Sequence, residues 1–354
     1  MTTTPVQAGG PQSVRTLVDA SGSVISGVGR EDVENRLGSG GFFWLDLPSV
    51  GDEEISWLRD LFHFHPLAIE DAEHFRQRPK LEEYDGYVVL VMYGSGADAS
   101  STDDSLDSPG SGCSPDDLQS VSEVHCFVSG KYVVTVHRGN CPAFRALVTR
   151  LQVHSLIGEG PGQLFYRMAD TLVDSYFPVL SDLDDKIDTL QSAVISRPTN
   201  DQLAQLLDYK SALIALRRVI APQRDVFASL AGGVTFLPGL DVEAQRYFRD
   251  IYDHLIRLSD LVDSYRDLLS GTTDAYLSVV SNQLNLVMKQ LTIIATIFLP
   301  LSFLTGFFGQ NFAWLVRQLG SFWTFVVVGV GTEVVAVALL LAMFYRRGWI
   351  GNQT

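Results

Sequence analysis

The feature that most constrains the fold of this chain is an uncharged run of eighteen residues near its C-terminus, Leu291–Phe308. That length is about the minimum with which an α-helix crosses a hydrocarbon core of ~30 Å. A second apolar stretch, Phe322–Tyr345, follows after a short loop. The two stretches predict a hairpin of transmembrane helices at residues 291–311 and 322–345, joined by a loop at 312–321.

The first span continues a longer helical pattern that begins near residue 248. Apolar or aromatic residues fall alternately three and four positions apart, which is typical of a packing seam on an α-helix. The seam consists of Phe248, Ile251, Leu255, Leu258, Val262, Tyr265, Leu269, Thr272, Tyr276 and Val279. We therefore expect residues 240–290 to form a stalk helix that continues into the first span.

A second stripe lies on another face of the same helix, again at spacings of three or four. It is polar at one end and small or apolar within the span, and it consists of Asp274, Ser278, Ser281, Asn285, Met288, Leu291, Ala295, Leu299, Ser302, Gly306 and Gly309. Such a stripe suits a symmetric ring of helices around an axial pore. Small residues also let membrane helices pack closely, so the stripe alone leaves both interpretations open.

Six motifs stand out along the chain: Tyr247–His254, Tyr276–Asn282, Val287–Phe298 and the closing Gly309-x-Asn311, together with His65–Asp71 and Gln77–Lys80. These motifs resemble the CorA family of divalent-cation channels. The similarity covers nearly the whole chain after about residue 40. The chain departs from the family at one signature position, because Gln310 stands where the family's Gly-Met-Asn signature has Met.

The resemblance implies a fold and a function. The fold is an α+β cytosolic domain, a long helical stalk and two C-terminal transmembrane helices. The function is Mg²⁺ transport by a homopentameric channel in the inner or plasma membrane, gated by cytosolic Mg²⁺. Co²⁺, Ni²⁺ or Zn²⁺ are alternative cargoes.

The resemblance also assigns residues to the pore. Those at the mouth and along the span are Gly309, Gln310, Asn311, Ser302, Leu299, Leu291 and Met288, with Asn285 and Asp274 below. Amide and carbonyl groups at the mouth could hydrogen-bond the waters of a hydrated cation, since Mg²⁺ dehydrates reluctantly. Met288, Leu291 and Leu299 would form apolar constrictions that close by dewetting.

Five carboxylates resemble the family's regulatory cation sites: Glu70, Asp71, Asp170, Asp250 and Asp253. Hard cations take oxygen ligands, so one or two carboxylates from each of two subunits would be enough to hold Mg²⁺. Without the resemblance, Asp71 and Asp250 would be interpreted as ordinary surface residues.

Glu333 lies within the second span, where an ionised carboxylate costs a few kcal/mol on the lenient insertion scale. We therefore expect it to be protonated or bonded to another helix. A neutral, hydrogen-bonded structural role and a role in proton coupling both fit the sequence.

The rest of the chain divides by composition. Residues 1–12 predict a disordered tail. Residues 13–160 alternate strand and helix patterns, with a Ser-, Asp- and Gly-rich flexible insertion at 94–119. Residues 161–235 predict a helical hairpin with a turn at Pro198–Asn200. The last segment, 346–354, predicts a short tail.

Charge and cysteine usage limit the location and the partners of the chain. The formal charge of −15 argues against nucleic acid, whose phosphates require Lys and Arg. The three cysteines have no paired spacing, and the N-terminus lacks a signal-peptide pattern. Arg346 and Arg347 after the second span, and Lys289 before the first, predict that the N-terminal domain and the C-terminus are both cytoplasmic.

Other functions remain to be separated from Mg²⁺ transport. A zinc transporter of the ZntB type, with or without proton coupling, also departs from Gly-Met-Asn at the middle position. A non-conducting cation sensor would keep the carboxylate sites. An enzyme is disfavoured, because the sequence has no Gly-rich phosphate loop, nucleophile elbow or metalloprotease helix. The scattered histidines predict surface or packing roles.

Overall fold

The structure is a computed structural model that describes residues 14–97, 114–153, 161–239, 244–310, 313, 317 and 321–349. It has two compact units, residues 1–273 and 274–354, and their boundary falls within one long helix. The predicted tail at 1–12 and the segment 98–113 lie outside the described residues. So do Asn311 and most of the predicted loop at 312–321.

A mixed seven-stranded sheet forms the centre of the first unit. Its order is β2-β1-β3-β7-β6-β5-β4, and every neighbouring pair is antiparallel except β3 and β7, which are parallel. The strands are β1 (Thr16–Asp19), β2 (Val24–Ser26), β3 (Phe43–Leu47), β4 (Lys80–Tyr84), β5 (Tyr87–Ser95), β6 (Val121–Ser129) and β7 (Tyr132–His137). The sequence predicts strands at 80–93 and 121–137, the second split into a hairpin by Ser129 and Gly130; 121–137 is the hairpin β6–β7, and 80–93 also forms a hairpin, β4–β5, which was not predicted.

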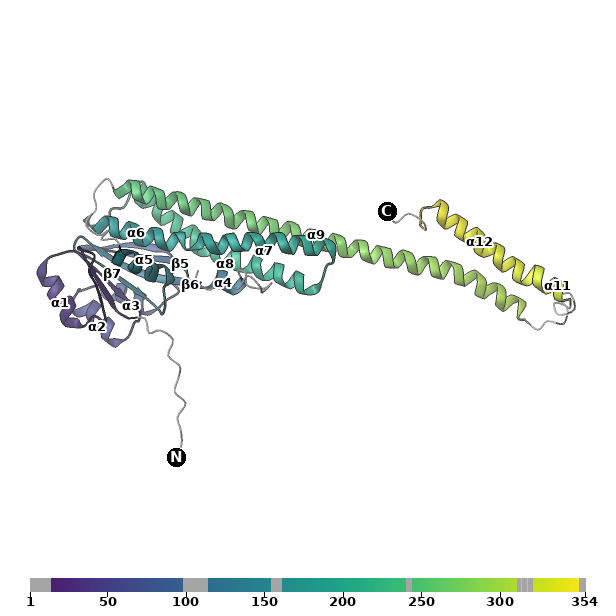
Figure 1. The fold of residues 1–354 in the computed structure, drawn as a ribbon, viewed down its shortest axis with the longest axis horizontal. Coiled ribbons are helices and arrows are strands. Elements are labelled where there is room, and N and C mark those ends of the chain that lie inside the picture. Colours follow the sequence, from purple (N-terminus) through teal and green to yellow (C-terminus); the bar gives the residue numbers. More distant parts are fainter. Residues whose placement is uncertain are drawn as a thin grey trace, which may run out of the picture. The chain divides into compact units, whose positions relative to one another are not determined.

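Helices cover both faces of the sheet (Figure 1). One face packs against α1 (Arg30–Ser39), α2 (Asp52–Asp60) and α3 (Pro66–Glu73), where Trp57 and Phe64 join a buried apolar cluster. The other face packs against α5 (Pro142–Val153) and α6 (Pro161–Asp174). Burial on both faces explains why β5 and β7 are nearly continuous apolar runs rather than alternating patterns.

The predicted flexible insertion at 94–119 is ordered at both ends. Strand β5 extends to Ser95, and α4 (Pro115–Gln119) forms just before β6. Ser114 caps α4, because its hydroxyl accepts a hydrogen bond from the amide of Asp117 while the Asp117 carboxylate accepts one from the Ser114 amide. The flexible insertion predicted at 94–119 was therefore too wide at both ends. The capping signal of Ser114 and Asp117 was already visible in the sequence.

The expected helical hairpin is built from three helices rather than two. The first arm of the hairpin, before the turn at Pro198–Asn200, is α6 followed by α7 (Tyr176–Ser196), which are separated at Ser175. The Ser175 hydroxyl bonds the carbonyl of Leu172 and accepts a hydrogen bond from the Ser95 amide, so it joins the helix break to β5. The second arm is α8 (Asn200–Ala231), capped at Thr199 as the turn signal predicted.

One helix, α9 (Ala244–Phe308), contains the predicted stalk and the first predicted span. The packing seam is buried as expected, with Ile251, Leu255, Leu258 and Leu269 each 0% exposed. The helix continues through Pro300 without a break. By length and composition, α9 and the segment Phe322–Arg346 could each cross a membrane.

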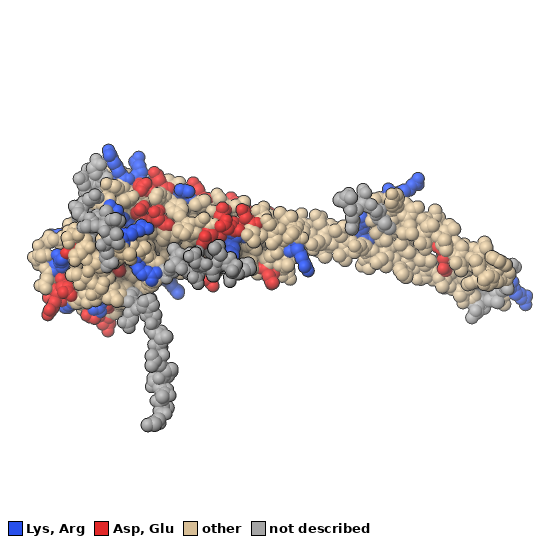
Figure 2. Space-filling view, in the orientation of Figure 1, with Lys and Arg blue, Asp and Glu red and all other residues tan. Residues whose placement is uncertain are grey.

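The second span is less regular than its sequence predicted. It consists of a short α11 (Phe322–Thr324), a π-helical turn η2 (Phe325–Val330) and α12 (Gly331–Arg346). The π-helical turn coincides with a run of valines and glycine, and these residues favour a regular α-helix less than Leu or Ala does. Figure 2 shows few charged side chains on this unit, as a segment in contact with lipid requires.

Candidate cation sites

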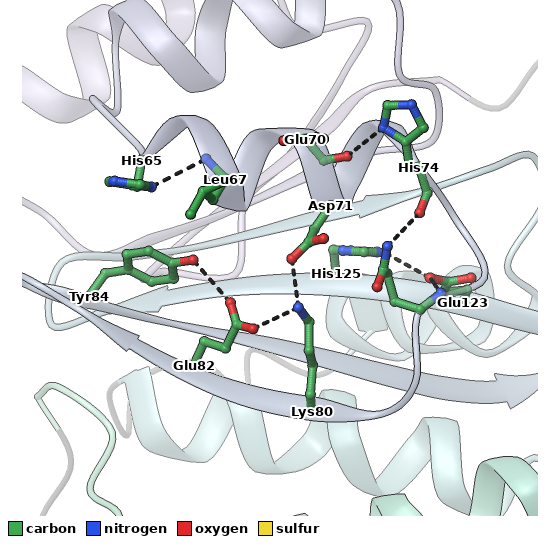
Figure 3. Close-up of polar contacts among 11 residues, drawn as sticks. His65, Leu67, Glu70, Asp71, His74, Lys80, Glu82, Tyr84, Glu123 and His125 are labelled. Atoms are coloured by element: carbon green, nitrogen blue, oxygen red, sulfur yellow. Dashed lines mark hydrogen bonds and ion pairs between the residues drawn. The ribbon is translucent and has the colours of Figure 1, made fainter.

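Helix α3 positions Glu70 and Asp71 in the first unit. Its N-cap is His65, whose ring Nδ1 accepts a hydrogen bond from the Leu67 amide, and Pro66 is the first helical residue. Figure 3 shows Asp71 pointing toward β4, where its Oδ2 lies 2.6 Å from Nζ of Lys80. The side chain of Glu70 is exposed.

Lys80 is a competitor for any cation at Asp71. Its ammonium group also lies 2.7 Å from Oε1 of Glu82. Burial lowers the pKa of Lys80, but hydrogen bonds to the two carboxylates outweigh that effect and raise its pKa overall. The lysine therefore stays charged at neutral pH, and a metal ion at Asp71 has to share or displace it.

A second acidic group forms where α6 meets α9. Nδ1 of His254 lies 3.0 Å from Oδ1 of Asp174 and 3.6 Å from Oδ1 of Asp170. Among the described residues this is the one group of three or more His, Cys, Asp or Glu side chains whose donor atoms converge within 4.8 Å. Two carboxylate oxygens and an imidazole nitrogen could provide part of the coordination of a divalent cation.

The electrostatics of this group fit a bound cation. Burial and then the negative charge of Asp174 raise the pKa of Asp170 to about 6. Oδ1 of Asp170 and Nδ1 of His254 are buried without a hydrogen-bond partner in the described part of the chain, although they lie close to each other. A cation would relieve both the carboxylate repulsion and the unsatisfied atoms.

Asp250 and Asp253 precede His254 on α9 but do not join this group. Oδ2 of Asp250 accepts a hydrogen bond of 2.8 Å from the hydroxyl of Tyr166. Asp253 is exposed and lines a shallow groove of about 340 Å³ along α9. Of the five predicted regulatory carboxylates, the fold thus brings Asp170 and Asp250 to the junction of α6 and α9, and Asp71 lies on α3.

Sequence reasoning missed Asp174 and His254 as potential ligands. Asp170 and Asp174 are four residues apart, which places them on one face of a helix, and His254 lies one turn after Asp250. These spacings were visible, but nothing in the sequence showed that α6 packs against α9 with Asp170 and Asp174 beside His254. The prediction that the histidines have only surface or packing roles did not anticipate the position of His254.

In the second unit, the predicted pore residues share one property. Side chains that are exposed in the single chain include Asp274, Asn285, Met288, Leu291, Leu299, Ser302 and Gln310, and Gly309 is exposed as well. The apolar members are prominent, with Leu291 65% and Leu299 76% exposed. This face of α9 is therefore available for a partner, for lipid or for a pore lining.

Glu333 has a partner within the second unit. Its Oε1 accepts a hydrogen bond of 2.9 Å from the hydroxyl of Thr305, which joins α12 to the membrane half of α9. This contact is the bond to another helix that the position of Glu333 required. It supports the structural role, although a carboxyl in this place could also carry a proton.

The known proteins of similar sequence are described as metal-ion transporters. The family described as "CorA-like Mg2+ transporter protein" matches residues 39–346. A cobalt/magnesium transport protein, CorA of Thermotoga maritima, is 33% identical over 310 residues, which cover 87% of this chain and 83% of that protein. A zinc transport protein, ZntB of Yersinia enterocolitica, is 25% identical over 79% of this chain and 80% of its own length.

The fold is also similar to a solved structure. The structure described as the complete CorA magnesium transporter from Methanocaldococcus jannaschii aligns with a TM-score of 0.76 and 20% sequence identity. The alignment covers 96% of this chain and 99% of that one. The soluble α/β domain, the long helix and the two C-terminal apolar helices are therefore one known architecture.

Proposed function

This chain belongs to the CorA-like Mg²⁺ transporter family and is a divalent-metal-ion transporter, and we propose that its cargo is Mg²⁺, which it carries as a homopentameric channel. The observation that carries the proposal is the exposed stripe on the membrane half of α9, which ends at Gly309. In a ring of subunits this stripe would line the axis. Proteins of similar sequence that are named cobalt/magnesium transporters support Mg²⁺, with Co²⁺ as a further cargo.

The proposed pore selects hydrated cations at its mouth. Asn311, which lies outside the described residues, would present a ring of side-chain amides to the waters around Mg²⁺, next to the exposed backbone of Gly309. Leu291, Leu299 and Met288 would form apolar constrictions further in. Because Mg²⁺ keeps its water, such a pore has to be wide enough for the hydrated ion and wet when open.

Gating is proposed to depend on the carboxylates of the first unit. Mg²⁺ held between Asp71 of one subunit and Asp250 of the next would tie neighbouring subunits together. The group formed by Asp170, Asp174 and His254 would hold a second ion within one subunit. Each ion favours the closed state only insofar as it binds that state more tightly, so closure follows cytosolic Mg²⁺.

Zinc transport is a second candidate with its own support. Gln310 departs from the Gly-Met-Asn signature, and a ZntB protein is among the similar sequences. The imidazole of His254 beside two carboxylates is also a donor set that Zn²⁺ accepts more readily than Mg²⁺ does. A third candidate, a non-conducting cation sensor, would use the same sites without ion flux.

Ion flux into proteoliposomes separates these candidates. Purified protein is reconstituted, and uptake of Mg²⁺, Zn²⁺, Co²⁺ and Ni²⁺ is measured in competition, with and without a pH gradient. We expect saturable Mg²⁺ uptake that does not require the gradient and that is lost in Asn311→Ala. Zn²⁺ uptake driven by the gradient would replace the proposal with zinc transport, and cation binding without flux would leave only a sensor.

The proposed location is the inner or plasma membrane, with the first unit and the C-terminus on the cytoplasmic side. Lys289 and the pair Arg346 and Arg347 support this orientation. Labelling of single cysteines placed at position 349 and in the loop after Gln310, using a reagent that does not cross the membrane, would test it. Only the loop position should react in intact cells.

A further inference from the structure

A cavity with a strongly basic lining lies in the first unit and has no part in the cation sites above. Its volume is about 1320 Å³, and five arginines from three separate segments line it. Arg76 and Arg78 belong to the loop after α3, Arg217 and Arg218 to α8, and Arg266 to α9. The segments are far apart in sequence, so no sequence motif predicts this cluster.

The cluster has an excess of positive charge. Arg217 and Arg266 both pair with Asp263, at 3.1 Å and 3.4 Å, and Arg266 also lies 3.5 Å from Asp267. Arg76, Arg78 and Arg218 make no ion pair with any described residue. In a chain with a net charge of −15, three exposed guanidinium groups without an ion pair around one cavity form a local positive surface that attracts an anion.

The loop that carries two of these arginines is held in a fixed conformation. Arg76 adopts a left-handed backbone conformation, with φ of 82°, which is unusual for a residue other than glycine. The buried carboxylate of Glu123 stabilises it by accepting the amide of Arg76 at 2.5 Å and the amide of Gln77 at 3.0 Å. A strained loop that is fixed by a buried group is a common feature of binding sites.

The opposite wall is equally rigid and partly apolar. Gln223 joins α8 to β5, because its side-chain amide makes hydrogen bonds of 2.8 Å and 3.2 Å with the backbone of Tyr93. Ile214 and Pro222 add apolar surface on the α8 side. Pro222 interrupts the hydrogen-bond ladder of α8, because it has no N–H to donate to the carbonyl of Arg218, four residues earlier.

The geometry points to a binding site for a soluble polyphosphate anion of the nucleoside triphosphate class. The unpaired guanidinium groups of Arg76, Arg78 and Arg218 bind the phosphates, because arginine matches phosphate oxygens in a bidentate geometry. The apolar surface of Ile214 and Pro222 on α8 contacts the base. The cavity is large enough for such a ligand.

The test is calorimetric titration of the full-length protein in detergent with ATP. The buffer contains EDTA and no divalent cation, so that the cation sites cannot contribute and the result does not depend on which ion the protein transports. We expect saturable binding that weakens as salt rises and that follows the order ATP, ADP, AMP. The double variant Arg76→Gln/Arg218→Gln should bind ATP at least about tenfold more weakly.

Two controls make the result decisive. Arg59→Gln removes an exposed arginine outside the cavity and should leave ATP affinity unchanged. The arginines are surface residues, so the melting temperature of each variant without ligand should match that of the parent. Failure of ATP to bind, or parent-like affinity in the double variant, would overturn the proposal. Tripolyphosphate that binds as tightly as ATP would overturn the part that assigns a nucleoside to the apolar wall.

Discussion

At the scale of single residues, Glu123 has the clearest structural role. It is buried on β6 beside the loop that follows α3. It accepts hydrogen bonds from the amides of Arg76 and Gln77 in that loop and contacts Nε2 of His125 at 2.9 Å. Burial raises the pKa of Glu123, but these hydrogen bonds outweigh burial and lower it below its ordinary value of 4.5. The charged carboxylate is thus part of the folded structure.

This shift predicts a pH-dependent loss of stability. A carboxyl whose pKa is lower in the folded state stabilises the fold above its unfolded pKa, and that contribution is lost as pH falls through the folded value. Glu123→Gln should lower the free energy of unfolding by about 1–3 kcal/mol at pH 7, and the difference from the parent should shrink below about pH 4.5. Thermal melts of both proteins from about pH 2 to about pH 8 measure this difference.

The matched control for Glu123 is Glu83→Gln. Glu83 is exposed on β4, so its replacement should have little effect at any of these pH values. If the free energies of unfolding of the parent and Glu123→Gln differ by a constant amount over the whole pH range, then the shape of the side chain rather than its charge holds the loop.

For Glu333, in the second unit, the question is also whether the charge or the hydrogen bond of a carboxyl group matters. Its carboxyl accepts a hydrogen bond from Thr305, and glutamine can accept the same bond without a titratable proton. We expect Glu333→Gln to assemble and transport like the parent, and Glu333→Leu to lower stability by about 1 kcal/mol. Flux with and without a pH gradient checks this, and a gradient effect that disappears in Glu333→Gln would show proton coupling instead.

The residues that could be predicted from sequence are those whose signal is local. Glu333 could be identified because a carboxylate in an apolar run is conspicuous. Asp170 was assigned by resemblance alone, and its partners Asp174 and His254 required knowledge of how α6 packs on α9. The arginine cavity could not be predicted at all, since Arg76, Arg218 and Arg266 become neighbours only after folding.

At the scale of elements, the seam of α9 accounts for the stability of the stalk. Leu255 is fully buried, and Leu268 on the same helix is 45% exposed. Leu255→Ala should lower the free energy of unfolding by about 2–5 kcal/mol through lost contacts and a cavity, whereas Leu268→Ala should change it by less than about 0.5 kcal/mol. The melting temperatures of the purified variants test this, and equal losses would mean that another chain covers the second face.

Long periodic elements were predictable, and interruptions within them were not. The seam from Phe248 to Leu269 repeats often enough to define a helix and its buried face. The break between α6 and α7 depends on a tertiary contact, because the Ser175 hydroxyl accepts a hydrogen bond from the amide of Ser95. The π-helical turn at Phe325–Val330 also had no periodic signal, since every residue there is apolar or glycine.

At the scale of the whole molecule, the single chain leaves the membrane half of α9 uncovered. The membrane half of α9 exposes a stripe of apolar side chains, and none of its predicted pore residues is buried among the residues that the structure describes. A helix of this kind requires lipid on one side and other helices on another. A ring of identical subunits meets both needs, but a sequence specifies only one subunit and so cannot give their number.

The proposed gate makes a prediction about the assembled ring. Asp250 accepts a hydrogen bond from Tyr166 of its own chain, and Asp71 pairs with Lys80, so neither carboxylate is free in the single subunit. A Mg²⁺ ion between them has to compete with both contacts. The site should therefore be of moderate affinity, as a reversible sensor of a common cation requires.

Asp250→Asn and Tyr166→Phe separate the metal ligand from the internal hydrogen bond. The first variant removes the charge, so the Mg²⁺ concentration that half-closes the channel should rise by about tenfold or more. The second frees the Asp250 carboxylate from the tyrosine, so closure should need the same Mg²⁺ as the parent or less. Both changes lie in the first unit, and flux through the open channel should therefore be unchanged.

Flux across a Mg²⁺ titration measures the midpoints, and limited proteolysis of the stalk reports the same transition without transport. If Asp250→Asn and the parent share one midpoint, then Asp250 is only a solvated residue of the stalk, and the ion that closes the ring binds elsewhere.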